Sequence, residues 1–171
     1  TPDDGANDIL YGDFGAGLMG WGTFDQPSGT GSFNVIDGAL QFNRSGSQAV
    51  VLQATGAAAG ANAPMTAQFL LGNTDSVRKR ISILLHDADF SDLFVCTLYL
   101  PANAPLRPYA MRTHTTKAWT NTTISFYAAS SGVGGTIPRA RTDVTESRSG
   151  SASAPGSSAR LRPMPATMAG A

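Results

Sequence analysis

The acidic residues and histidines are the side chains of this 171-residue sequence that could carry acid–base chemistry. Eleven aspartates and one glutamate are present, but no two of them form a recognisable catalytic motif. Glycoside hydrolysis needs two carboxylates that face each other across the scissile bond, and the sequence identifies no such pair. The two histidines, His86 and His114, adjoin no serine or cysteine motif of the kind that nucleophilic enzymes use. The sequence therefore predicts a protein without catalytic activity.

Three other groups of reactive or charged residues have simple structural interpretations. Residues 87–92 carry three aspartates, loosely spaced as in a calcium loop, but they lack the glycine and the distal glutamate of such loops. We expect this segment to be a solvated hairpin tip. The basic run at 78–80 is typical of a solvated strand edge. Cys96, the single cysteine, lies in an apolar stretch where a thiol packs as a small hydrophobic side chain.

Composition excludes several classes of protein. Twelve basic and twelve acidic side chains cancel, and only 14% of residues are charged, which argues against a nucleic-acid partner. No apolar run approaches the roughly 20 residues that a membrane-spanning helix needs. Glutamate occurs once and lysine twice, whereas there are 19 glycines and 10 prolines. Because residues that favour exposed helices are nearly absent, we expect an all-β chain.

Strand signals recur about every ten to twelve residues along the chain. Asp37-Gly38 separates two short alternating segments and is the strongest hairpin signal. The most apolar part predicts two long antiparallel strands joined by the loop at 87–92. This spacing is typical of a β-sandwich, most simply a jelly roll. The expected strands are 9–14, 18–24, 32–36, 39–42, 49–53, 65–71, 80–85, 93–100, 109–113 and 123–128.

The chain changes character near residue 132. Residues 133–171 contain no aromatic residue, and 22 of these 39 are alanine, glycine, serine or proline. The first part carries a net charge of −3 and the second +3. We therefore divide the chain into a β-sandwich core at 1–132 and an irregular tail at 133–171, with a final strand at about 141–145. Few apolar groups in the tail offset its ordering entropy, so we expect contacts with the core and with neighbouring copies to hold it.

The N-terminus and two sequons bear on the location of the protein. The polar start lacks the basic and apolar regions of a signal peptide, which fits a cytosolic protein or one whose leader has been removed. Asn43 and Asn121 each begin an N-x-[ST] triplet. Each triplet has two interpretations, an ordinary asparagine at a strand end or a glycosylation acceptor. A surface rich in threonine, serine and asparagine favours an exported protein.

Short motifs indicate a family. Residues 7–14 (NDILYGDF) and 17–21 (GLMGW) resemble the opening of the carbohydrate-binding-module-like, or galactose-binding-like, jelly rolls of exported bacterial proteins. The hairpin at 35–40 (VIDGAL) fits the same pattern, and 142–145 (TDVT) resembles a worn form of their closing strand. The resemblance covers about residues 7–145. It implies a jelly-roll fold and an extracellular or cell-surface location, and it says little about activity.

The resemblance also implies candidate sites. In calcium-containing members, the glutamate after the phenylalanine of the first motif and an aspartate in the final strand help to hold a structural ion, and Asp13 and Asp143 are the carboxylates that remain here for such a site. Gly15 stands where those members have glutamate, and Tyr11 stands where they have asparagine. A calcium ion prefers six to eight oxygen ligands, so the expected state has no cofactor, with structural calcium as the alternative.

Aromatic residues are the candidates for binding sugar rings. Trp21, Trp119, Tyr99 and Tyr109 would form the platform of a lectin-like module. The position of Trp21 is usually buried in the resembling family. Trp119 lies between polar residues, which is compatible with an exposed loop and with burial.

The sequence leaves two functional hypotheses. The first is a non-catalytic extracellular structural protein that self-assembles into a filament, tube or surface layer. In it, the tail of one copy contacts the next copy by adding a strand to an open sheet edge. The alternative is a carbohydrate-binding module displayed on the cell surface or attached to a secreted enzyme. The expected partners are copies of the chain itself or glycans. The assembly hypothesis relies on five tail arginines, Arg139, Arg141, Arg148, Arg160 and Arg162.

Overall fold

The part of the chain that the structure describes folds as an all-β sandwich of ten strands. The computed structural model describes residues 8–129 and 137–146, and these contain antiparallel strands and turns. No helix in the described ranges has the length and apolar character needed to cross a bilayer. The strands are β1 (Gly22–Gln26), β2 (Gly31–Ile36), β3 (Ala39–Arg44), β4 (Gln48–Ala54), β5 (Pro64–Asn73), β6 (Lys79–Asp87), β7 (Leu93–Leu100), β8 (Ala104–His114), β9 (Thr122–Ala128) and β10 (Ile137–Glu146).

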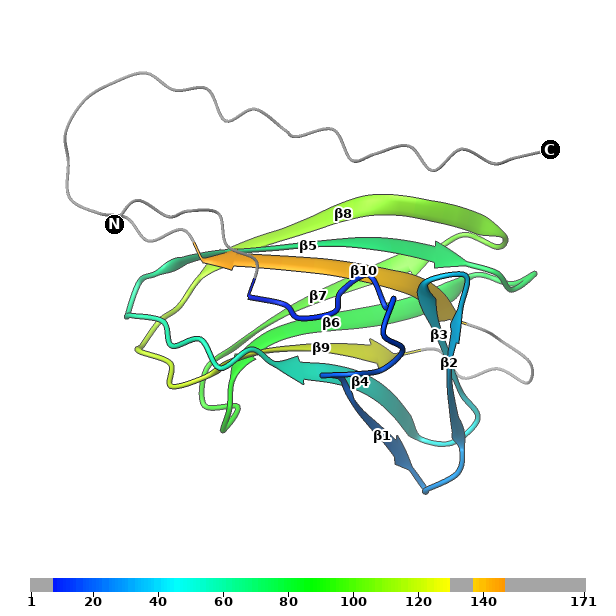
Figure 1. Cartoon of the computed structure of the whole chain (residues 1–171), viewed down its shortest axis with the longest axis horizontal. Coiled ribbons are helices and arrows are strands. Elements are labelled where there is room, and N and C mark those ends of the chain that lie inside the picture. Colours follow the sequence, from blue (N-terminus) through cyan, green and yellow to red (C-terminus); the bar gives the residue numbers. More distant parts are fainter. Residues whose placement is uncertain (1–7, 130–136, 147–171) are drawn as a thin grey trace, which may run out of the picture.

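Two five-stranded sheets face each other as two layers (Figure 1). Sheet A has the order β1-β4-β9-β6-β7, and sheet B has the order β2-β3-β10-β5-β8. Neighbours in each sheet are mostly distant in sequence, so the chain crosses repeatedly between the layers, as in a jelly roll. The expected all-β jelly-roll sandwich is confirmed.

The core lies between the sheets because alternate side chains of each strand point to opposite faces. Ile81, Ile83 and Leu85 of β6 are fully buried in this layer. Phe126 of sheet A meets Phe69 of sheet B edge to face, with ring centroids 5.7 Å apart and planes at 89°. This geometry is the favoured one for aromatic pairs, so the contact joins the two layers at their centre.

The N-terminal segment closes one edge of the sandwich. Phe14 and Trp21 are buried, with ring centroids 5.3 Å apart, and Trp21 continues the aromatic cluster to Phe126 at 6.3 Å. The buried amide of Gln53 fastens this segment to β4. It accepts a hydrogen bond from the backbone NH of Leu10 at 2.8 Å and donates to the Leu10 and Gly20 carbonyl oxygens. Both the oxygen and the NH2 group of this amide are hydrogen-bonded, so neither carries the desolvation cost of a buried polar group without a partner.

Two predicted hairpins are confirmed. The turn between β2 and β3 is Asp37-Gly38, and both residues have positive φ, 52° and 67°. β6 and β7 pair as the long apolar hairpin, and Cys96 is partly buried against the core as expected.

The predicted final strand is present and is longer than expected. β10 runs from 137 to 146, beyond the expected 141–145, and it pairs with β3 and β5 in the middle of sheet B. β10 lies after residue 132, in the part of the chain where a final strand was expected. Its backbone has ladder partners on both sides within sheet B. Arg139 and Arg141 belong to β10, while Arg148, Arg160 and Arg162 lie outside the described residues.

The contact between the layers predicts a specific loss of stability. Replacing Phe126 by alanine removes a fully buried ring that touches both Phe69 and Trp21, and we expect a loss of about 3–5 kcal/mol. Urea unfolding measures this loss as a lower midpoint with an unchanged slope. The control is Val95→Thr on the exposed face of β7, which should change stability by less than about 0.5 kcal/mol. Equal losses in the two variants would contradict the assigned core.

Candidate functional site

The outer face of sheet A carries a continuous row of side chains. Strand register pairs Phe24, Val50, Tyr127, Ser82 and Thr97 directly across β1, β4, β9, β6 and β7. Directly paired residues of a sheet lie on the same face. Because Phe126 and Ile83, next to two members of the row, point into the core, the row points outward. The same alternation that builds the core thus builds this surface.

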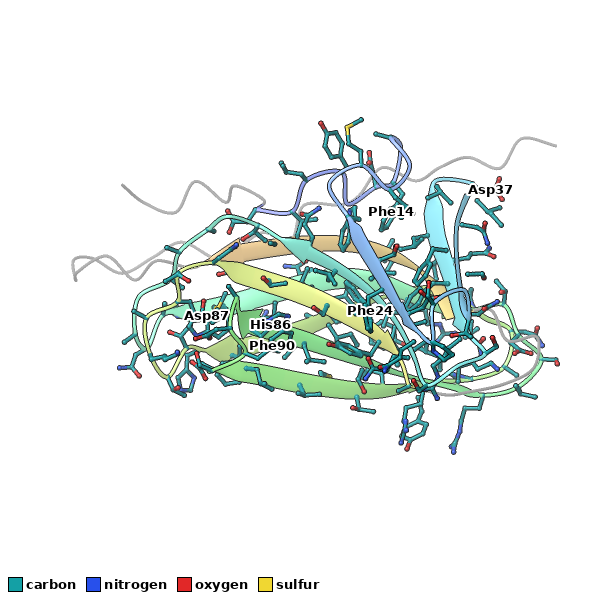
Figure 2. The ribbon with its side chains drawn as sticks, turned by 90° about the horizontal axis from the view of Figure 1, so that it is seen from below. Phe14, Phe24, Asp37, His86, Asp87 and Phe90 are labelled. Atoms are coloured by element: carbon teal, nitrogen blue, oxygen red, sulfur yellow. The ribbon has the colours of Figure 1, made fainter. Side chains whose placement is uncertain are left out.

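A groove of about 460 Å³ lies on this face. Its floor includes Ser82, Leu84 and Tyr127, and Phe90 contributes from the loop between β6 and β7. Figure 2 shows Phe24, His86 and Phe90 over the strands of sheet A. The described residues that line the groove are Arg44, Ser47, Gln48, Ala49, Arg80, Ser82, Leu84, Phe90, Tyr127, Ala128 and Ala129.

Aromatic rings stand along this face with much of their surface in solvent. Phe24 is 49% exposed, Phe90 48% and Tyr99 56%. Tyr127 is half-buried, and burial raises the pKa of its phenol, so the hydroxyl stays protonated and can donate a hydrogen bond. Exposed rings beside hydroxyl groups are the combination that binds a flat, hydroxyl-rich molecule, because the rings cover its apolar faces and the hydroxyls meet its edges.

Arginines occupy one end of the groove. Arg44 donates from Nη1 to the Ser47 carbonyl and from Nη2 to the Ala129 carbonyl at 3.4 Å, and Arg80 donates to that same Ala129 oxygen at 3.1 Å. Arg80 pairs across the strands with Tyr99, and the guanidinium of Arg78 lies 4.7 Å from the centroid of the Tyr99 ring. This end of the face is therefore positively charged and lies beside an aromatic ring.

Phe90 is held in place by a tight turn and by a histidine. Its NH donates to the Asp87 carbonyl at 3.0 Å, its φ is 58°, and its ring stacks on His86 with centroids 3.9 Å apart. His86 is buried, and this burial lowers the pKa of its imidazole although the carbonyl and charge of Asp87 oppose the effect. A neutral imidazole thus supports the exposed Phe90 ring.

His86 and Ser125 form a hydrogen-bonded pair that resembles part of a catalytic triad. His86 Nε2 lies 2.8 Å from Ser125 Oγ, and Nδ1 lies 2.8 Å from the backbone oxygen of Asp87. However, Ser125 is 1% exposed, and its strand pairs with β4 on one side and β6 on the other. The neighbouring backbone NH groups are used in these ladders, so none is positioned to stabilise an oxyanion. The pair thus holds the imidazole against which Phe90 stacks.

The loop after β6 has an exposed tip at residues 88–91, as expected, but its two ends, Asp87 and Asp92, form a buried clasp that the sequence did not predict. Asp92 Oδ2 accepts hydrogen bonds from Trp119 Nε1 at 2.8 Å and from the backbone NH of Thr116 at 2.8 Å. Asp87 Oδ1 accepts from the NH and hydroxyl of Thr120, at 3.0 and 3.2 Å. Both carboxylates are buried because the backbone of the loop at 115–121 supplies donors that a sequence pattern does not display.

These hydrogen bonds also set the charge of the two acids. Burial alone would raise the pKa of both carboxyl groups. For Asp92, the hydrogen bonds from Trp119, Thr116 and Lys117 outweigh burial, and for Asp87 the donors on Ala88, Asn121 and Thr120 do the same, so both pKa values fall below the ordinary value. Both acids are therefore ionised structural groups.

The four aromatic candidates lie in different environments. Trp119 is 2% exposed, so the expectation that it could be an exposed platform is wrong: its indole NH is bound by Asp92, and this draws the ring inward. Trp21 is buried, as the resemblance implies. Tyr109 is partly buried and stacks on Phe69, with centroids 6.5 Å apart. Of the four, only Tyr99 presents a largely exposed ring, and it lies on the outer face of sheet A.

The candidate metal and glycosylation residues occupy separate places. Asp13 is exposed and accepts a hydrogen bond from the NH of Gly15 at 3.1 Å. Asp143 lies on β10, where its backbone pairs with Gln68 of β5, and the side chains of β10 are outside the described part of the structure. Among the described residues, no three histidine, cysteine or acidic side chains form a metal-binding group. Asn43 lies on β3, and the side-chain oxygen of Asn121 accepts a hydrogen bond from the NH of Gly56 at 2.9 Å.

Sequence reasoning missed the main residues of the groove and of the row of side chains beside it. Phe24, Phe90, Tyr127 and Arg44 were not among the candidates. For Tyr127 the sequence does carry a signal. Adjacent residues of a strand point to opposite faces of the sheet, so Tyr127 points outward if its neighbour Phe126 points into the core. No sequence signal places Arg44 beside Arg80, since 36 positions separate them and only the crossing of the chain between sheets brings them together.

Comparison with known proteins defines the class of fold. No family model matches the chain, and no curated protein matches it. Among solved structures, the enzymatically active domain of tailspike protein 4 from bacteriophage CBA120 aligns with a TM-score of 0.63 at 13% identity, over 82% of this chain and 21% of that one. A CBM4 carbohydrate-binding module aligns with a TM-score of 0.57 at 18% identity, over 74% of this chain and 86% of the module.

Two further structures share the fold. An agarase aligns with a TM-score of 0.58 at 7% identity, over 82% of this chain and 26% of the agarase, and a variant of a family 29 carbohydrate-binding module aligns with a TM-score of 0.51. The chain thus spans about a fifth of the tailspike structure but most of a binding module. Its fold is the jelly roll of the carbohydrate-binding modules, as the opening motifs implied. At these identities the likeness concerns the fold, and both binding modules and enzymes contain it.

The clasp predicts how stability depends on pH. Because the folded-state pKa of Asp92 is lowered, its ionised form stabilises the fold above the unfolded pKa of about 3.9, and this contribution is lost as the pH falls through the folded value. Asp92→Asn should therefore lower stability at pH 7, with a smaller difference from the wild type at pH 3. Urea midpoints at pH 7, 5 and 3 measure the effect.

A matched control for this prediction is Asp13→Asn. It makes the same chemical change at an exposed carboxylate with one local hydrogen bond, to Gly15, and should change the midpoint little. If Asp92→Asn lowered the urea midpoint by the same amount at pH 3 and at pH 7, the ionised carboxylate would not be the group that holds the loop.

Proposed function

We propose that this chain is a non-catalytic carbohydrate-binding module that holds a glycan along the outer face of sheet A. The observation that carries the proposal is the groove lined by Tyr127, Phe90 and two arginines, with Phe24 in the adjoining row of side chains. The resemblance of the opening motifs and the fold shared with solved carbohydrate-binding modules support it. Such a module acts outside the cell, where polysaccharides are found, so an extracellular or cell-surface location belongs to the same proposal.

The arrangement suits a chain of sugar rings. β1 and β9 are separated by β4, so the strands that carry Phe24 and Tyr127 lie about 10 Å apart, which is the scale of a disaccharide. The apolar faces of the sugar rings would stack on the aromatic rings. Ser82, which hydrogen-bonds Thr97 at 2.9 Å, and the Tyr127 hydroxyl would meet the sugar hydroxyls. Because the floor is a sheet and not a mobile loop, little conformational entropy is lost on binding.

The absence of catalysis is part of the proposal. Among the described residues that line the groove, none is an aspartate or glutamate, and hydrolysis of a glycan needs two such groups beside the bond. The nearby acids Asp87 and Asp92 are buried and bonded to backbone and side-chain donors. They are therefore not available as an acid and a nucleophile.

Self-assembly through the C-terminal tail is the second candidate function. It rests on the charge division of the chain, with five arginines after residue 132 and a net charge of −3 before it. The position of β10 favours glycan binding over assembly. The strand that was expected to pair with a neighbouring copy already pairs with β3 and β5 in its own sheet.

Replacing an exposed aromatic ring tests the binding proposal. Phe24→Ala removes a ring that is 49% exposed and lies on an edge strand, so the fold should be kept while glycan affinity falls roughly threefold to tenfold. Affinity electrophoresis of the wild type against a panel of plant, algal and bacterial polysaccharides finds a ligand, and the variant is compared on that ligand.

Tyr11→Asn serves as the control for Phe24→Ala. Tyr11 is a similarly exposed aromatic residue in the N-terminal segment, and asparagine accepts its positive φ of 53°. Its loss should leave affinity unchanged. A wild-type protein that no polysaccharide in the panel retards, or equal losses in both variants, would refute the binding function.

Removing residues 147–171 separates the two candidate functions. If the chain is a binding module, the shortened protein keeps all ten strands, and it should retain its glycan affinity and its unfolding midpoint. If the tail drives assembly, the full chain forms polymers in negative-stain images and the shortened chain does not. Polymers from both forms would count against a role for the tail in assembly.

A further inference from the structure

β7 forms one edge of sheet A, and within the described residues its ladder partner is β6 alone. The backbone groups on its other side can therefore pair with a strand of another chain. Natural sheets block such edges with charged residues, prolines, bulges or short strands. β7 (LFVCTLYL) contains no charge and no proline, and its register with β6 runs without a bulge over all eight residues.

The other three edges of the two described sheets are better protected. β8 carries Arg107, Arg112 and two prolines. β1 is five residues long, contains Asp25 and leads into Pro27. β2 is six residues long and begins with glycine. β7 is therefore the longest edge strand without charge or proline in the described sheets.

Both faces of β7 are apolar and incompletely covered. On the outer face, Leu93, Val95 and Tyr99 are 40%, 54% and 56% exposed. On the inner face, Phe94 and Cys96 are only partly buried, whereas the inward side chains of the neighbouring β6 are fully buried. A strand paired along this edge would remove apolar surface from water on both faces.

One end of β7 is basic. Arg80 is the ladder partner of Tyr99, and the exposed Arg78 holds its guanidinium 4.7 Å from the centroid of the Tyr99 ring. Lys79 lies at the same end, where an ion pair with Asp75 at 2.7 Å balances its charge. The exposed Arg78 therefore points its charge over the end of the edge strand.

The other end of β7 is acidic. The loop at 87–92, which leads into β7, carries three aspartates, and Lys117 lies 3.9 Å from the one at residue 87. Asp89 is exposed at the tip of this loop. Hydrogen bonds from Ser91 lower the pKa of its carboxyl, so Asp89 is ionised at neutral pH.

We propose that β7 is the contact surface of a homodimer, in which the β7 strands of two copies pair antiparallel about a two-fold axis. Antiparallel pairing brings the Arg78 end of each copy beside the Asp89 end of the other, so the opposite charges meet twice. A parallel pairing would place like charges together. The partner is therefore a second copy of the chain, and the two-fold axis closes the assembly at two copies.

This dimer uses neither the groove nor the C-terminal tail. The two-fold axis is perpendicular to the joined sheet, so both outer faces point the same way and the two grooves lie on one side of the dimer. If the groove binds a glycan, a long polymer could engage both copies at once and gain avidity. That consequence rests on the proposed function, whereas the dimer does not.

A charge placed on the edge strand tests the contact. Sedimentation equilibrium of the full chain, across roughly a hundredfold range of concentration, should show a species of twice 17.7 kDa. Val95→Lys places two like charges near the axis and should weaken the dimer at least about tenfold. Val95→Thr, which is uncharged and of similar shape, should keep it. Ile36→Lys makes the same kind of change at an exposed position on the β2 edge and should also keep it.

Charge reversal tests the antiparallel arrangement. Arg78→Glu and Asp89→Lys should each weaken the dimer roughly threefold to tenfold, because each places like charges together at two points. The double variant Arg78→Glu/Asp89→Lys should recover most of the loss. Both residues are exposed, so these variants should fold, and thermal unfolding checks this. The reversal series decides alone if Val95→Lys does not fold.

The outcomes separate the dimer from the glycan-binding function. A dimer that Val95→Lys dissociates, that Ile36→Lys leaves intact and that the double reversal restores supports the proposal. A monomer at every concentration, a polymer, or a dimer that Ile36→Lys and Val95→Lys weaken alike overturns it. A full chain that is monomeric while the chain without residues 147–171 dimerises also overturns it, because the tail then occupies the edge. Glycan affinity is measured separately, and its loss or retention leaves this result unchanged.

Discussion

The alternation of side chains along β9 is the constraint on which both the core and the groove depend. Phe126 points inward and joins the two sheets through Phe69, while its neighbours Ser125 and Tyr127 point outward into the surface that carries the groove. A shift of one residue in the register of β9 would exchange these faces, placing a phenol in the core and a phenyl ring in solvent. Because β9 is the middle strand of sheet A, the ladders to β4 and β6 fix this register on both sides.

Local patterns in the sequence were enough for much of the fold. The turn at Asp37-Gly38, the long hairpin of β6 and β7, and the partial burial of Cys96 follow from turn chemistry and alternation, which act over a few residues. The last strand was harder to predict from the sequence, because a segment poor in apolar residues favours an irregular tail over a strand of the core. β10 forms since β3 and β5 leave a gap in sheet B with unpaired backbone groups on both sides, and this is a property of the sheet rather than of the segment.

The candidate site was predicted less well, for reasons that the clasp illustrates. Trp119 lies among polar neighbours, and nothing in that neighbourhood reveals that Asp92, 27 positions earlier, binds its indole NH. The same network removes two aspartates from the surface and positions Phe90, so one set of long-range hydrogen bonds determines which aromatic residues are available. Of the four aromatic residues chosen from the sequence, Tyr99 alone has a largely exposed ring, because exposure depends on contacts between segments distant along the chain.

The burial of both tryptophans has a spectroscopic consequence. Trp21 and Trp119 are the only indoles in the sequence, and neither lines the groove. Their emission reports on two separate structural elements, the N-terminal segment beside Phe14 and the clasp around Asp92. Unfolding would shift this emission to longer wavelength as both rings enter water. A molecule seated on Tyr127 would leave it nearly unchanged, so intrinsic fluorescence is a monitor of integrity here and a poor reporter of occupancy.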